Sequence, residues 1–371
     1  MPPQRNLAVI AALALFVSGC GDDRGLEPGG PAPPEASAET DCEELGGGGE
    51  SAPPVRQAGK PPYGFNDHAG LVRSIGVAED AELLQRAGAT LWRVAIDWRF
   101  AEPEPGVLEL ETHDAIYCEG LARGIRPVFH ITGAPDWAAD QGECPVESCI
   151  HPPAVDALDD LAEFAGAVAE RYPDAAAIEA WNEPNLANFW SEPDPHGYAD
   201  VLAATYDGVK EAVPSMPVLG GSLSNTSGSD ATRHEFAKFL AEIYEAGAAE
   251  HMDGLAFHPY PIAPLGSPGE RFRSTMAELR RTMRAAGEGG EPIWVTEVGL
   301  PVEPGISEAD QARTMRGIYG RLAAAPDVEA VIFHTLLDDA DASADAGSFG
   351  WIKRGEDGDL EPRPVYEEFG G

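Results

Sequence analysis

The chain has 371 residues, a formal net charge of −38 at pH 7 and 43% hydrophobic residues. A surface this acidic repels nucleic acid and anionic lipid headgroups, so electrostatic binding to either is not expected as the main function. The length from residue 61 onward suits one large domain, because a barrel of alternating strands and helices takes about 250 residues.

The first twenty residues predict export. Arg5 precedes an apolar run, residues 7–17, that is too short to cross a bilayer. The run ends in Val17-Ser18-Gly19-Cys20, which resembles the lipobox of bacterial lipoproteins, whose cysteine is acylated and becomes the mature N-terminus. An ordinary secretory signal with a chance cysteine is the alternative. We expect a signal peptide over residues 1–19 and a cell-surface lipoprotein anchored through Cys20.

A flexible tether is predicted over residues 20–60. This segment is rich in Gly, Pro and Glu and has almost no large apolar side chain to bury, so it cannot form a core of its own. Contact with a membrane is then expected only through the N-terminal lipid anchor.

The remaining cysteines predict disulfides, because an exported protein folds in an oxidising compartment. Cys144 and Cys149 lie five positions apart in one predicted loop, where a local disulfide is expected. Cys42 and Cys118 are left over, and a bridge between them would attach the tether to the domain. Zinc binding is the alternative for four cysteines, but the sequence has no Cys-x-x-Cys spacing.

From residue 61 onward, strand-like runs alternate with segments of helical periodicity, which is typical of βαβ units. One such helical segment is 158–172, with apolar residues three or four positions apart. No Gly-x-Gly-x-x-Gly follows the first strand, so a dinucleotide-binding sheet is not favoured and no cofactor is expected. The pattern predicts a single (β/α)8 TIM barrel over residues 61–371, with strands at 63–66, 90–97, 126–132, 177–183, 217–223, 252–260, 292–299 and 330–337.

Two glutamates end strands of this barrel. Glu183 follows the fourth run within Trp181-Asn182-Glu183-Pro184, and Glu297 ends the seventh. Active sites of such barrels are built at the C-terminal strand ends, and three βα units place these residues across the mouth from each other. A single glutamate there can equally cap a helix or pair with an arginine. Two of them indicate the carboxylate pair of glycoside hydrolysis.

The fourth run carries a family resemblance. Residues 181–186, Trp-Asn-Glu-Pro-Asn-Leu, with Phe189-Trp190 following, resemble strand four of clan A glycoside hydrolases, most closely family 39 and its relatives near family 5. The resemblance covers the domain and not the tether. It implies that Glu183 is the general acid/base and Glu297 the nucleophile of a retaining mechanism.

The resemblance also implies roles for residues around the pair. Arg93 matches the strand-two arginine that holds the nucleophile charged and oriented, and Asn182 matches the asparagine that binds the sugar 2-hydroxyl. His258 and Tyr260 match a strand-six pair found near the nucleophile. A structural role for each is the alternative.

Further substrate-binding candidates have a weaker basis. His130 and Trp137 follow strand three, where a tryptophan can stack on a pyranose or cover the barrel top, and Trp294 is a candidate wall beside Glu297. Weaker candidates still are Asn66, Trp98, Asn185 and Trp190. The clan often places a tryptophan at strand eight, but this run has none, so His334 or Trp351 is expected to replace it.

These observations predict a retaining glycosidase that cleaves O-glycosidic bonds, preferentially β-linked, of a poly- or oligosaccharide. One alternative is a lipoprotein that binds glycan without cleaving it, and the other is a transglycosylase that uses the same two glutamates. We expect a monomer that has no metal site, since the histidines lack ligand spacing. The barrel loops decide the sugar, the linkage and whether cleavage is internal or terminal.

Overall fold

The computed structural model describes residue 42 and residues 59–67, 75–262, 267–338, 348–355 and 357–370. The predicted leader, Cys20 and nearly all of the tether lie outside the described residues. Within the described part of the chain, no helix is both long and apolar enough to cross a membrane.

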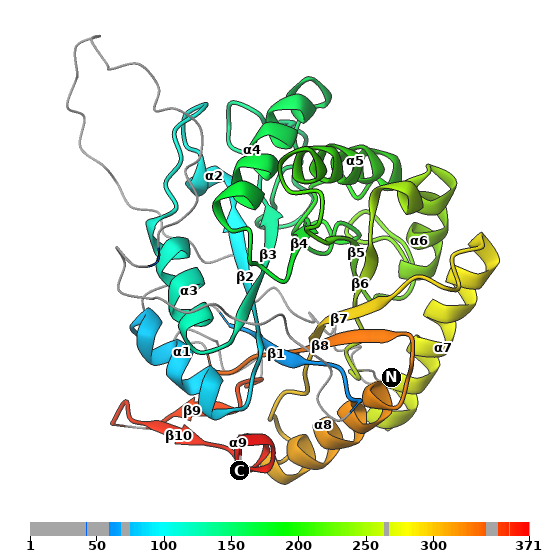
Figure 1. Ribbon diagram of the computed structural model, residues 1–371. Coiled ribbons are helices and arrows are strands. Elements are labelled where there is room, and N and C mark those ends of the chain that lie inside the picture. The colour runs from blue at the N-terminus through cyan, green and yellow to red at the C-terminus, as the bar shows by residue number, and fades with distance from the viewer. Residues whose placement is uncertain are drawn as a thin grey trace.

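Eight parallel strands close into one barrel, in which each strand pairs with the next along the chain and β8 pairs with β1. The prediction of a (β/α)8 TIM barrel is thereby confirmed (Figure 1). The strands are β1 Tyr63–Asn66, β2 Leu91–Asp97, β3 Arg126–Thr132, β4 Ala177–Ala180, β5 Val218–Ser224, β6 Gly254–His258, β7 Ile293–Val298 and β8 Val328–His334.

Helices alternate with the strands and form a ring around the barrel (Figure 1). A short antiparallel pair, β9 Ile352–Arg354 and β10 Leu360–Pro362, follows β8 and leads into the last helix, which packs on α8. The helices are α1 Val77–Arg86, α2 Trp98–Ala101, α3 Glu111–Ala122, α4 Leu158–Arg171, α5 Pro195–Ala212, α6 Phe236–Glu245, α7 Pro268–Ala286, α8 Glu308–Ala323 and α9 Pro364–Gly370, with 3-10 turns η1 Val155–Ala157 and η2 Ala248–His251.

Local sequence signals set the starts of the helices. The Ser307 side chain accepts a hydrogen bond from the backbone N–H of Asp310, and the Asp310 carboxylate accepts one from the backbone N–H of Ser307. This reciprocal capping satisfies two N–H groups that the helix leaves unpaired and stabilises it by about 1 kcal/mol. Ser267 and Glu270 cap α7 in the same way.

The barrel has an apolar interior and an apolar outer layer, because successive strand residues point to opposite faces. Outward side chains, such as Phe129 and Val295, pack under the helices. The inward side chains of the lower barrel form a separate cluster of Leu91, Val128, Ala176, Ala177, Leu219, Ala256, Trp294, Ala330 and Ile332. The apolar cluster closes the barrel below the strand ends, which leaves the mouth for polar groups.

Four strands end earlier than the sequence predicted: besides β4 and β6, β7 ends at Val298 rather than at residue 299, and β8 ends at His334 rather than at residue 337. β4 stops at Ala180 rather than at residue 183, and β6 stops at His258 rather than at residue 260. Trp181 and Glu183 have positive φ angles of 71° and 42°, a backbone conformation that a strand cannot hold. The chain therefore turns at the end of β4, and Glu183 is presented by the turn.

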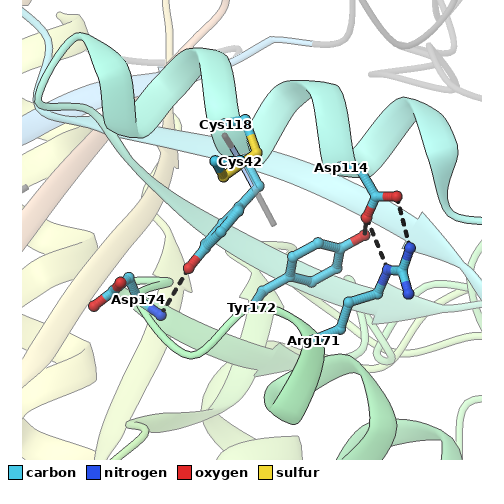
Figure 2. The surroundings of a disulfide bond; sticks show 7 residues. Cys42, Asp114, Cys118, Arg171, Tyr172 and Asp174 are labelled. Atoms are coloured by element: carbon cyan, nitrogen blue, oxygen red, sulfur yellow. Dashed lines mark hydrogen bonds and ion pairs between the residues drawn. A yellow bond between two sulfur atoms is a disulfide. The ribbon is translucent and has the colours of Figure 1, made fainter. Parts of the chain in front are cut away.

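Both cysteine pairs suggested by the sequence are joined. Cys144 and Cys149 bridge within the loop after β3, and Cys42 bridges to Cys118 of α3. Near the second bridge, the Asp114 carboxylate of α3 accepts hydrogen bonds from Arg171 and from the Tyr172 hydroxyl at the end of α4 (Figure 2). Residue 42 of the tether is thus covalently attached to a helix that is itself held to its neighbour.

Removing the Cys42–Cys118 bridge by alanine at both positions should lower the free energy of unfolding by about 2–4 kcal/mol, because the bridge closes a long loop. The bond spans 76 positions, whereas Cys144–Cys149 spans five, so alanine at the latter pair should cost less. Denaturant unfolding of both double variants under oxidising conditions measures the difference. Equal losses would contradict the loop-closure argument.

Candidate active site

A single buried arginine organises the polar groups at the barrel mouth. Arg93 of β2 has no exposed surface, and its Nε donates to Glu179 Oε2 at 2.6 Å. Its Nη1 donates to Glu297 Oε1 at 2.7 Å, and its Nη2 donates to Asn182 Oδ1 at 2.9 Å. Arg93 therefore links β2, β4 and β7 through one guanidinium, whose rigid geometry suits such multiple contacts.

A register shift in β7 brings two consecutive side chains into the barrel. The pairing of β7 with β8 is irregular between Val295 and Val298, and both valines pack in the outer layer. Thr296 and Glu297 between them point inward, since Thr296 Oγ1 donates to Glu179 Oε1 at 2.8 Å and Glu297 binds Arg93. A bulge redirects a side chain in this way at many functional sites.

Glu297 is held as a carboxylate by donors on both of its oxygens. Asn66 Nδ2 donates to Oε1 at 2.9 Å, and the Tyr260 hydroxyl donates to Oε2 at 2.6 Å. Burial opposes ionisation, but the neighbouring His258, Arg93 and His334 side chains and the hydrogen bond from Tyr260 outweigh it and lower the pKa of Glu297 to about 2. Glu297 is therefore ionised at neutral pH.

The same contacts keep the neighbouring groups in their donor forms. Burial, followed by the charge of Glu297, raises the pKa of the Tyr260 hydroxyl well above its ordinary value. Burial lowers the pKa of Arg93, but the charges of Glu179 and Glu297 outweigh this effect and raise it overall. Both side chains thus remain hydrogen-bond donors to Glu297 over the physiological pH range.

Glu183 lies opposite this group. His258 Nδ1 is 2.9 Å from Glu183 Oε1 and 3.8 Å from Glu297 Oε2. One oxygen of each glutamate and a nitrogen of His258 lie within 4.8 Å of one another. Three such atoms can hold a cation, but Arg93, Asn66 and Tyr260 already donate to Glu297. The group is therefore better suited to proton transfer and nucleophilic attack.

Of the predicted substrate-binding residues, Arg93, Asn182, His258 and Tyr260 lie together with the two glutamates, as their contacts show. His130 is buried inside the barrel on β3, in register with Glu179. Of these six residues, Arg93 lies within β2, and the other five come from strand ends or from the turns that directly follow them.

The predicted tryptophans take different places. Trp137 is half-buried on the loop after β3, where its indole N–H donates to the Glu102 carbonyl and its ring packs edge-on against Trp98. Trp294 lies in the apolar cluster of the lower barrel and not at the mouth. Its inward position one pleat below Thr296 makes it a packing residue, which corrects the expectation of a wall beside Glu297.

Of the weaker candidates, one lies at the site and two have contacts elsewhere. Asn66 joins the main group, but Asn185 is fully buried and its amide donates to the backbone carbonyls of Ser224 and His234. Trp190 is buried and packs edge-on against Trp181. These contacts give Asn185 and Trp190 structural roles.

Strand eight brings a histidine rather than a tryptophan to the site. His334 Nδ1 lies 3.2 Å from Asn66 Nδ2 and 4.0 Å from Glu297 Oε2. Trp351 is buried and packs on Phe65 and Phe333, away from the carboxylates. Of the two residues expected to replace the strand-eight tryptophan, only His334 is therefore at the site.

Sequence reasoning missed three buried residues of the site: Glu179, Ser222 and Thr296. Glu179 has no exposed surface and binds Arg93, although it lies within the apolar run of β4. Glu179 lies two positions after Ala177 and therefore points to the same, inward face of the strand. Its charge was a signal that could have been noticed, because a buried carboxylate needs a partner. Ser222 and Thr296 gave no such signal.

Several solved structures with a fold similar to that of this chain are glycoside hydrolases. One is a family 39 glycoside hydrolase from Bacteroides cellulosilyticus, with 22% identity and a TM-score of 0.65 over 86% of this chain and 65% of that chain. Another is a monomeric β-xylosidase from Caulobacter crescentus, with 19% identity and a TM-score of 0.62 over 86% of this chain and 69% of that chain. At these identities the likeness shows a common fold.

In sequence, a β-xylosidase from Geobacillus stearothermophilus is 38% identical over 65 residues, which are 18% of this chain and 12% of the relative. No family model matches the chain. The chain thus spans less than two thirds of the family 39 structure and matches a short part of the xylosidase. The two solved structures share their fold with this chain, and the Geobacillus xylosidase shares one short stretch of sequence with it.

Proposed function

We propose that the protein is a retaining glycoside hydrolase that cleaves β-glycosidic bonds of an oligo- or polysaccharide. The observation that carries the proposal is the pair of glutamates at the barrel mouth, with one oxygen of each within 4.8 Å of the other. Retaining enzymes hold their carboxyl groups about 5–5.5 Å apart, whereas inverting enzymes leave about 6.5–9.5 Å for a water molecule. The glycosidase neighbours support the same reaction class.

In the first step, Glu297 attacks the anomeric carbon. Its pKa of about 2 keeps it charged, and Arg93 and Tyr260 hold its oxygens in place. Glu183 gives its proton to the departing oxygen as the glycosidic bond breaks. The products of this step are a glycosyl ester of Glu297 and a free leaving group.

In the second step, water hydrolyses the ester. Glu183, now a carboxylate, takes a proton from water as the water oxygen attacks the anomeric carbon, and Glu297 leaves as a carboxylate. Two displacements at one carbon restore its configuration. Asn182, held by Arg93 at 2.9 Å, is in place to bind the sugar 2-hydroxyl during both steps.

The surroundings of the reaction are part of the proposal. Acylation of Cys20 would place the enzyme on the cell surface, with the tether between lipid and barrel, and the working form would be a monomer. Xylosides are the first substrates to try, because β-xylosidase structures from Caulobacter crescentus and a short stretch of the Geobacillus β-xylosidase sequence are similar to this chain.

Hydrolysis of aryl β-xylosides, β-glucosides and β-mannosides tests the proposal, with the anomer of the first-formed sugar followed by NMR. We expect the β anomer to appear first. An α anomer would contradict retention, and a protein that binds these glycans without cleaving any of them would contradict the hydrolase. Longer products at high substrate concentration would identify transglycosylation by the same pair.

A further inference from the structure

A line of hydrogen bonds leads from Glu183 into the barrel. Glu183 Oε1 is 2.9 Å from His258 Nδ1, and His258 Nε2 is 3.4 Å from Ser222 Oγ. The Ser222 hydroxyl donates to Glu179 Oε1 at 2.7 Å. His258, Ser222 and Glu179 have no exposed surface. Glu183, the general acid of the proposed reaction, is thus connected to a second, fully buried carboxylate. This line of hydrogen bonds, from Glu183 through His258 and Ser222 to Glu179, is the relay.

The backbone of β5 is distorted where it presents Ser222. The pairing of β5 with β6 shifts between Gly221 and Leu223, and Leu223 packs in the outer layer. Ser222 itself has a positive φ of 51°, a backbone conformation that is unfavourable for a residue other than glycine. The bulge turns the Ser222 hydroxyl toward the barrel axis, between His258 and Glu179.

The donors around Glu179 fix the direction of the hydrogen bonds. Arg93 Nε donates to one of its oxygens, and the hydroxyls of Thr296 and Ser222 donate to the other. A serine hydroxyl has one proton, so Ser222 can only accept from His258. The proton of the imidazole must then lie on Nε2, which leaves Nδ1 to face Glu183.

We propose that Ser222 and Glu179 are positioning residues that hold His258 in its Nε2–H form and thereby keep the acid proton on Glu183. The inference rests on the proposed function. With Nε2 occupied, a neutral imidazole offers Glu183 an acceptor at Nδ1, and the 2.9 Å contact is then a bond from the protonated carboxyl. Ser222 and Glu179, which do not touch the substrate, in this way set the protonation state of Glu183.

Other charged groups lie close to His258 and Ser222 and also affect their protonation and position. Glu297 lies 3.8 Å from His258 Nδ1, and Arg93 Nη2 lies 3.5 Å from Ser222 Oγ. Tyr260, two residues after β6, and His334, at the end of β8, contact Glu297. A substitution at Ser222 leaves the contacts of Glu297 with Tyr260 and His334 in place and removes only the long contact from Arg93, which keeps Glu179, Glu297 and Asn182 as partners.

The relay moves no net proton during the reaction. Glu183 transfers its proton to the leaving oxygen while the Glu297 ester forms, and His258 stays neutral with Nε2–H on Ser222. When water attacks the ester, Glu183 recovers a proton from that water, and the starting arrangement returns. The relay therefore matters most for leaving groups that require protonation.

Ser222→Ala tests the proposal through leaving-group dependence. Without an acceptor at Nε2, the imidazole can carry its proton on Nδ1 and donate to an ionised Glu183. We expect kcat/KM for an alkyl or disaccharide β-glycoside to fall about 100-fold, because general acid catalysis is lost. For the dinitrophenyl β-glycoside of the same sugar, whose leaving group needs no proton, the decrease should be less than about threefold.

Thr296→Val is the matched control. It removes the other hydroxyl that donates to Glu179 Oε1 but leaves the partner of His258 in place. We expect Thr296→Val to change kcat/KM by the same factor for the alkyl or disaccharide glycoside and for the dinitrophenyl glycoside. Comparing two substrates on one preparation also removes any effect of incomplete folding, because the ratio does not depend on the amount of active protein.

The outcomes separate the relay from the proposed function. Equal losses on both substrates in Ser222→Ala, or the same selective loss in Thr296→Val, would overturn the relay while hydrolysis by the wild type stands. A wild type that cleaves neither substrate would overturn the proposed function itself. A selective loss confined to Ser222→Ala supports both.

Discussion

Glu297→Ala should reduce hydrolysis of every cleaved β-glycoside by at least about 10⁴-fold, since it removes the group that attacks the anomeric carbon. The stability of the variant should fall little or rise, because a buried carboxylate is removed while Arg93 keeps Glu179 as its partner. Activity on the best aryl β-glycoside, together with thermal unfolding, measures both effects. More than about 1% residual activity would contradict the assignment of the nucleophile.

Glu291→Gln is a suitable control for this variant. Burial, only partly offset by a hydrogen bond from Tyr244, raises the pKa of Glu291 to about 7, so it is another unusual carboxyl group. It precedes β7, at the end of the barrel opposite the mouth. We expect its substitution to leave hydrolysis unchanged. That result would show that the loss in Glu297→Ala comes from the place of Glu297 at the barrel mouth and not from removing any carboxyl group with a shifted pKa.

Added azide gives a second test of Glu297→Ala. A small anion can occupy the space of the missing carboxylate and attack the anomeric carbon directly, with Glu183 still able to protonate the leaving group. One displacement inverts the configuration, so a β-glycoside should yield the α-glycosyl azide, identified by NMR. A β-azide would assign Glu297 to the acid/base role instead.

Arg93→Met should lower the free energy of unfolding at neutral pH by about 3–5 kcal/mol, because two buried carboxylates lose their cation. Arg93 contacts Glu179 at 2.6 Å and Glu297 at 2.7 Å. Arg93→Lys retains the charge but not the geometry that reaches both glutamates and Asn182, so its loss should be smaller but substantial. Denaturant unfolding of the three proteins measures this order, and a stable Arg93→Met protein would contradict it.

The effect of Arg93→Met should depend on pH. The pKa of Glu297 is lowered from 4.5 to about 2 in the folded protein, so its contribution to stability is present above about 4.5 and is lost as the pH falls toward 2. The variant lacks much of this contribution. The stability difference between the two proteins should therefore shrink as the pH falls from 4.5 to 2. In the variant, kcat/KM should also begin to fall at a higher pH on the acidic side.

Much of the fold was predictable, because it depends on local patterns. Eight strand-like runs separated by helical periodicity predicted the barrel. Strand ends were less predictable, since the turn at Trp181 depends on a backbone conformation that no local pattern marks. The grouping of Glu183 with Glu297 followed from the barrel rule that strand ends meet at one face.

The inner part of the site was not predictable, and Trp294 shows why. The run containing Trp294 and Glu297 reads as one strand, but the register shift after Val295 decides which side chains point into the barrel. Glu179 gains its role from Arg93, Ser222 and Thr296, which come from three other strands. No spacing along the chain records contacts of this kind.

The sequence by itself determined the barrel and the two strand-end glutamates, because these depend on residue type and on periodicity along the chain, whereas the role of Arg93 followed from the family resemblance. Only the tertiary structure decided that Trp294 packs below the site and that His334, at the end of β8, lies beside Glu297. It also decided that Glu179 is connected to His258 through Ser222. The physical reason is that bulges and side-chain contacts between distant strands set these positions, and both arise only when the barrel closes.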